Sequence, residues 1–211
     1  FDEQAYRFQL LFTPTDDLSV LVNAHGRDLD GTASVFRANA LTRGSNQLNA
    51  NFDRDTVHYD GNLLGNGFDN NPQAYEGFGT SVTVDYSMDD ISFTSITALE
   101  TAEGFSLGDV DGGVNADPAA DINGDGTTEA SYPGFIPFSA VTQDLLNDLK
   151  QFTQEIRWAS NNDGAFNWQA GAFYFDSSFS VTSVDGFFGA SEVFHENTTM
   201  AVFGQSTYEL S

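Results

Sequence analysis

One acidic segment of the chain, residues 117–129, carries oxygen ligands at the spacing of a calcium loop. Asp121, Asn123 and Asp125 alternate along it, and Gly126 follows them. Oxygen side chains at positions 1, 3 and 5, with a glycine at position 6 for the sharp turn, form the first half of an EF-hand-type loop. These residues are therefore candidate ligands for Ca²⁺.

The second half of this motif is incomplete. Thr127 offers a backbone carbonyl at position 7 and Glu129 falls at position 9, but position 12 is Tyr132 instead of a bidentate Glu. Further candidate ligands are Asp109, Asp111 and Asp117. Two interpretations remain open, because Asp-Asn-Gly runs also form ordinary turns on solvated loops. One is a partial calcium site, and the other is a loop without metal.

No other constellation in the sequence predicts chemistry. His25, His58 and His195 are single and widely separated, so no zinc-ligand spacing occurs. A Gly-x-Ser-x-Gly nucleophile motif is also missing from the sequence. Paired carboxylates such as Asp89 and Asp90 lie in a tight turn, where structure explains them. The sequence therefore predicts a protein that is not an enzyme.

Composition limits the partners of the chain. Its 211 residues include 31 acidic and 7 basic side chains, which give a net charge of −24. Nucleic acid is excluded as a partner, because phosphate binding needs clustered Lys and Arg. Aromatic residues make up 14% of the chain, with 20 Phe, so the acidic balance does not indicate disorder. The chain has no cysteine, which excludes disulfides and thiolate metal sites.

Hydrophobic residues alternate with polar ones in seven segments, which predicts seven β-strands. In the first, Tyr6, Phe8, Leu10 and Phe12 share one face and Arg7 lies on the other. The predicted strands are 4–13, 18–28, 77–87, 91–103, 151–160, 166–181 and 196–210. The phase of the last strand is ambiguous at 200–203, and helix-like leucine spacing makes 139–149 a short helix candidate.

The connections between these strands alternate in length. Tight turns are expected near residues 14–17, 88–90 and 161–164, and long loops at about 29–76, 104–150 and 182–195. Short periplasmic turns and long extracellular loops are typical of outer-membrane barrels, whose strands need about 9–11 residues to cross the bilayer. We therefore expect an all-β antiparallel meander of about seven long strands, forming part of a transmembrane β-barrel.

Aromatic residues on the predicted apolar face gather beside the tight turns, as a membrane-interface girdle requires. They are Phe12, Tyr86, Phe93, Trp158, Phe166, Trp168 and Tyr208. Polar residues of the opposite phase are expected to face a plug or the lumen. They include Arg7, Asn23, Thr83, Glu155 and Arg157.

Four segments resemble strands of the TonB-dependent outer-membrane receptors. Residues 151–160, QFTQEIRWAS, resemble the family's QEIRLAS strand, and a short turn follows in both. Residues 166–175, FNWQAGAFYF, are similar to its W-x-x-G-x-F/Y-Y-F strand. Residues 201–210 resemble its A-x-F-G-Q-x-x-Y strand, and 11–18 resemble its P-T-D-D-L hairpin.

The resemblance implies a piece of a 22-stranded barrel that surrounds a plug and imports a ferric siderophore, cobalamin or a glycan. The implied partners are TonB, through an N-terminal part, a nutrient at the extracellular loops, and outer-membrane lipid. Residues 1–211 would be a partial barrel domain without plug or TonB box, because seven strands cannot close a bacterial barrel. The alternative is a secreted, soluble, calcium-stabilised β-sandwich that serves as an adhesin or lectin-like module.

Overall fold

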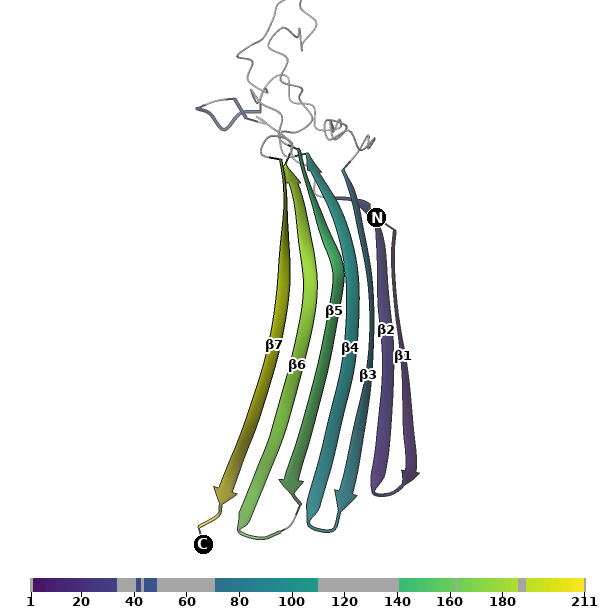
Figure 1. Cartoon of the computed structure of the whole chain (residues 1–211), viewed down its shortest axis with the longest axis vertical. Coiled ribbons are helices and arrows are strands. Elements are labelled where there is room, and N and C mark those ends of the chain that lie inside the picture. The colour runs from purple at the N-terminus through teal and green to yellow at the C-terminus, as the bar shows by residue number, and fades with distance from the viewer. Residues whose placement is uncertain are drawn as a thin grey trace, which may run out of the picture.

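All seven predicted strands are present in a single antiparallel sheet (Figure 1). The computed structural model describes residues 2–33, 41–42, 44–48, 71–109, 141–161, 163–185 and 189–210. The strands are β1 (Asp2–Thr15), β2 (Leu18–Thr32), β3 (Pro72–Met88), β4 (Ile91–Asp109), β5 (Val141–Ser160), β6 (Phe166–Asp185) and β7 (Gly189–Tyr208). Each strand pairs with the next in chain order, so the topology is an uninterrupted meander.

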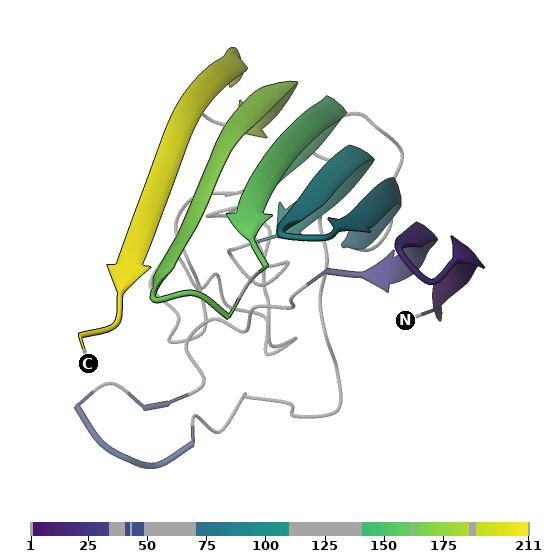
Figure 2. The same ribbon diagram turned by 90° about the horizontal axis from the view of Figure 1, so that it is seen from below.

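The sheet is curved and open. Viewed along the strands, β7 to β1 follow one arc, with the two end strands well apart (Figure 2). β1 and β7 are both odd-numbered in an antiparallel order and therefore run in the same direction. Direct pairing of these two edges would be parallel, so an all-antiparallel closure of this sheet needs an odd number of additional strands.

The tight turns are confirmed, but the strands extend beyond their predicted ends. β2 reaches Thr32 and β3 begins at Pro72, so their connection is limited to residues 33–71. The connection between β4 and β5 is likewise limited to 110–140. The expected long loop at 182–195 is wrong, because β6 and β7 leave only residues 186–188 between them.

The helix candidate at 139–149 is also wrong, because this segment is the first half of β5. The reason is a β-bulge. The register of β5 shifts against both neighbours near Asn147–Lys150, and Asp148 has a positive φ of 51°. An extra residue in one strand changes the phase of its side chains. The leucines on either side of the bulge therefore show helix-like spacing within a strand.

Fully buried side chains are few in the part of the chain that the structure describes. Among the large residues, only Leu107, Val141 and Asn71 are less than 2% exposed. They lie at the ends of β3, β4 and β5 opposite the tight turns. Among the described residues, no helix is long and apolar enough to span a membrane. Away from that end, most of the sheet has no covering layer of described residues on either face.

Candidate membrane-facing surface

The strand register sorts the side chains into two faces of different chemistry. Residues directly opposite each other in an antiparallel pair project to the same side of the sheet. Tyr86 of β3 pairs with Phe93 of β4, which pairs with Trp158 of β5, so the three rings share one side. We call this side the apolar face and the opposite side the polar face.

An uncharged band covers the turn-proximal half of the apolar face. In β3 it runs from Phe78 to Tyr86, and in β4 from Ile91 to Leu99. Every large hydrophobic side chain of β2 to β6 that the structure describes as exposed belongs to this band. These are Phe78, Val82, Tyr86, Leu99, Ile156, Trp158 and Phe166. Exposed apolar patches of this extent mark an interaction surface.

The seven aromatic residues predicted for a membrane interface all lie on the apolar face near the tight turns. Phe166 pairs with Tyr208, and Trp168 is on the same face two residues further along β6. Phe12 lies near the first turn, opposite Val20. The rings of Phe93 and Trp158 are in contact, with centroids 4.5 Å apart and a tilt of 51°. The predicted grouping is confirmed, whereas contact with lipid stays a prediction.

Three of the polar side chains that interrupt the band hydrogen-bond to one another. The Thr97 hydroxyl donates to Gln154 Oε1 at 2.6 Å, and Gln154 Nε2 donates to Ser95 Oγ at 3.0 Å. Sequence reasoning placed Thr97 on this face but missed the cluster. Its only signal was polar residues at apolar positions of the alternation. Mutual hydrogen bonding removes the large cost of placing such groups in an apolar medium.

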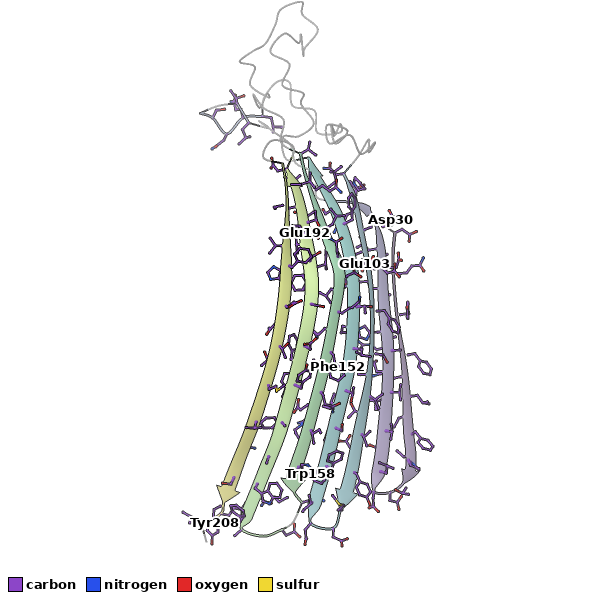
Figure 3. All side chains as sticks on the ribbon, viewed as in Figure 1. Asp30, Glu103, Phe152, Trp158, Glu192 and Tyr208 are labelled. Atoms are coloured by element: carbon purple, nitrogen blue, oxygen red, sulfur yellow. The ribbon has the colours of Figure 1, made fainter. Side chains whose placement is uncertain are left out.

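Carboxylates begin where the band ends, on the side away from the tight turns. Asp28 pairs with Glu76, and Glu76 with Glu103, so three acids adjoin on the apolar face. In Figure 3, Asp30, Glu103 and Glu192 lie toward the loop end, and Trp158 and Tyr208 lie at the turn end. In β2 to β4 the apolar face is therefore divided into an uncharged half and an acidic half. Sequence reasoning did not predict this division.

The polar face carries charged and hydrogen-bonding side chains at the same height as the band. The residues predicted to face a plug or lumen all share this face. They are Arg7, Asn23, Thr83, Glu155 and Arg157. Thr94 Oγ1 donates to Asp85 Oδ1 at 2.7 Å on this face. Its chemistry is that of a water-exposed surface.

The predicted calcium ligands lie outside the described residues. They are Asp117, Asp121, Asn123, Asp125, Thr127 and Glu129. The same holds for the side chain of Asp109 and for Asp111. Within the described ranges, no group of three or more His, Asp or Glu side chains is arranged to hold a metal ion. The calcium site thus stays a prediction from the sequence.

Comparison with known proteins gave no relative on which to base a function. The chain matches no family model, no curated protein and no solved structure. The two faces of the sheet and the sequence motifs are therefore the features that indicate a function.

Proposed function

We propose that this chain forms part of the wall of a bacterial outer-membrane β-barrel, in a TonB-dependent transporter that takes up a scarce nutrient. The observation that carries the proposal is the uncharged band on one face of the sheet. Its side chains are exposed or partly exposed, follow one another in register across β2 to β5, and end in aromatic rings beside the tight turns. The resemblance of four segments to strands of the TonB-dependent receptors supports the choice of transporter.

The height of the band agrees with that of a bilayer. From Phe78 to Tyr86 it spans about nine residues, or roughly 27–30 Å at the usual strand rise. Tilted by about 35–45°, as strands are in barrels, this length covers roughly 20–24 Å along the membrane normal. The lipid-facing band of outer-membrane barrels is about 25 Å tall. A band of this height is what a single bilayer crossing requires.

The polar face would line the interior of the barrel. The cost of placing its charges in lipid excludes that face from the hydrocarbon region. TonB and a plug would act through parts of the polypeptide beyond these strands. The nutrient, of the ferric siderophore, cobalamin or glycan class, would be captured at the extracellular connections 33–71 and 110–140. Localisation in the bacterial outer membrane and the absence of enzymatic activity belong to the same proposal.

The soluble, calcium-stabilised β-sandwich is the weaker candidate. A sandwich buries the apolar face of one sheet against a second sheet. All seven described strands belong to one sheet, and its apolar band is exposed. Calcium binding at Asp121 and Asp125 is compatible with either function, because both candidates place the loop in water. We keep it as a separate proposal, to be tested by calcium titration of Asp121→Ala and Asp125→Ala.

Membrane fractionation and tryptophan depth test the proposal together. The gene product that carries this sequence should appear in the outer-membrane fraction. The chain has two tryptophans, Trp158 and Trp168, and both lie at the turn end of the band. In vesicles, lipids brominated near the headgroup should quench their fluorescence more than lipids brominated near the chain end.

Two results would contradict this proposal. One is a soluble protein whose fluorescence is indifferent to brominated lipid, which would favour the sandwich. The other is strongest quenching by the deeply brominated lipid, which would place the tryptophans away from the interface. Trp158→Phe and Trp168→Phe, each retaining one tryptophan, serve as matched controls for the two positions.

A further inference from the structure

A depression of about 430 Å³ on the polar face gathers basic side chains in an otherwise acidic protein. It lies across β1 to β4 and is lined by Arg7, His25, Arg27, Tyr75 and Glu100, among others. The structure describes six Arg, Lys or His side chains in all, and three of them line this depression. Because the chain carries a net charge of −24, such a concentration of basic groups requires an explanation.

Arg27 is held in place from two sides. Its Nε donates to Glu3 Oε1 at 2.8 Å, and its guanidinium carbon lies 5.6 Å from the centroid of the Tyr75 ring. A cation over an aromatic face is attracted by the ring. The bond to Glu3 uses only one of the five donors of the guanidinium, so the others remain able to reach a second acceptor.

His25 is also held by neighbours on the same face. Its Nε2 lies 3.3 Å from Glu100 Oε2, and its Nδ1 lies 3.2 Å from the amide nitrogen of Asn23. Glu100 reaches across β3 at Gly79, where a Cβ would collide with its carboxylate. This contact therefore requires a glycine between the two strands. Both ring nitrogens of His25 therefore already have partners among the described residues.

Arg7 is the basic residue of this depression that has no partner among the described residues. It pairs across the strands with His25 and is the diagonal neighbour of Arg27, which pairs with Ala5. Diagonal neighbours on one face are about 7–8 Å apart, within reach of long side chains. Among the described residues, Arg7 makes no ion pair or hydrogen bond. Glu3 bonds Arg27 and Glu100 lies against His25, so neither of these two carboxylates is in contact with Arg7.

We propose that this depression binds the carboxylate group of a small organic solute between Arg7 and Arg27. The planar guanidinium fork matches a carboxylate with two parallel hydrogen bonds. The half-buried Tyr75 ring, which lies over Gly77 and faces the Arg27 guanidinium, forms a wall of the depression against which the carbon skeleton of the ligand would lie. The inference rests on the proposed function in one respect, because that function places the polar face along the path of a solute.

Citrate is a suitable probe, because it presents three carboxylates on a small skeleton. Its binding to the gene product in detergent micelles is measured by calorimetry at low ionic strength, where screening is weak. We expect Arg7→Gln to weaken citrate binding at least tenfold, since charge-assisted hydrogen bonds are lost. Arg7→Lys should restore only part of the affinity, because lysine lacks the fork. Trimethyl citrate, which has no charge, should not bind.

Arg157→Gln is the matched control variant. Arg157 lies on the same polar face but outside the depression, with its Nε 2.9 Å from Glu155 Oε1. Its substitution should change citrate affinity less than twofold. Equal binding by the wild type and Arg7→Gln, or no binding by a folded wild type, would overturn the inference. Either result would leave the proposed outer-membrane location unaffected. Citrate binding by a soluble protein, in contrast, would refute the proposed transporter but not the carboxylate site.

Discussion

The two faces of this one sheet satisfy their polar groups in different ways. On the apolar face, Ser95, Thr97 and Gln154 bond only to one another and to backbone, and in β3 and β4 no charge enters the band. On the polar face, Arg27 and Glu3 form an ion pair whose side chains are about half exposed. Neutral groups that satisfy one another suit an apolar medium, whereas exposed ion pairs suit water. The two faces therefore suit different surroundings, and the proposed membrane location predicts which of them meets lipid.

The largest difference in stability between the two faces is expected for a charge placed in the middle of the band. Val82→Arg places a guanidinium on the apolar face, and Ser81→Arg places one at the same height on the polar face. In lipid vesicles, we expect Val82→Arg to lower the free energy of unfolding by about 2–4 kcal/mol, the usual cost of arginine near the bilayer centre. Urea titration in vesicles measures the difference.

Ser81→Arg is the control for this prediction and should change the stability by less than about 1 kcal/mol, as a substitution on a wet surface does. Equal effects of the two variants would show that the faces do not differ in their surroundings. The same pair without lipid should show little difference, because the membrane supplies the penalty.

Glycines on neighbouring strands give the next largest contrast. Gly171 lies on the polar face beneath the ring of Phe203, where a Cβ would also lie 2.6 Å from the carbonyl oxygen of Ile156. Gly204 lies on the apolar face, where the nearest atom to a Cβ is the Gln169 carbonyl oxygen at 3.4 Å. Gly171→Ala should destabilise the sheet by about 1–3 kcal/mol through overpacking against atoms that cannot move freely.

Gly204→Ala should be neutral or stabilising by up to about 1 kcal/mol, because alanine restricts the unfolded chain. Denaturant midpoints of both variants, measured in the same micelles, test the pair. A larger loss for Gly204→Ala than for Gly171→Ala would refute the described packing of Phe203.

Alternation in the sequence was sufficient to predict the strands and most of the faces, because side chains of a strand have a strict period of two. It failed where that period is broken or blurred. The bulge at Asp148 shifts the phase of β5, so the sequence pattern there wrongly predicted a helix. In β7, the run 200–203 is apolar throughout, and only pairing with β6 places Met200 and Val202 on the apolar face. The register resolves what periodicity leaves open.

The candidate site was less predictable than the strands. The aromatic group near the turns followed from strand phase and turn position alone. The Ser95–Thr97–Gln154 cluster and the depression at Arg7 each join residues more than 50 positions or several strands apart. Only the pairing of strands brings such residues together, and a single sequence does not specify which residues face each other across two long connections.

Direct coupling across the apolar face is expected for Phe93 and Trp158, whose rings are in contact. Tilted aromatic pairs contribute about 0.5–1.5 kcal/mol beyond the area they bury. A double-mutant cycle with Phe93→Leu and Trp158→Leu should therefore give a coupling energy in this range. Because no charge is involved, the coupling should not change between low and high salt. Additive effects of the two substitutions would show that the rings do not interact.

The matching cycle on the polar face concerns Glu3 and Arg27, with the smallest expected effect. Glu3→Gln and Arg27→Gln should couple by about 0.2–1 kcal/mol, because their side chains are about half exposed and water screens the pair. This coupling should fall as salt rises from 0.01 to about 1 M, since the Debye length shrinks from about 30 to 3 Å. A salt-independent coupling would mean that the pair is shielded from water. The polar face would then be covered in the folded protein, and the difference between the two faces would lie in what covers each of them.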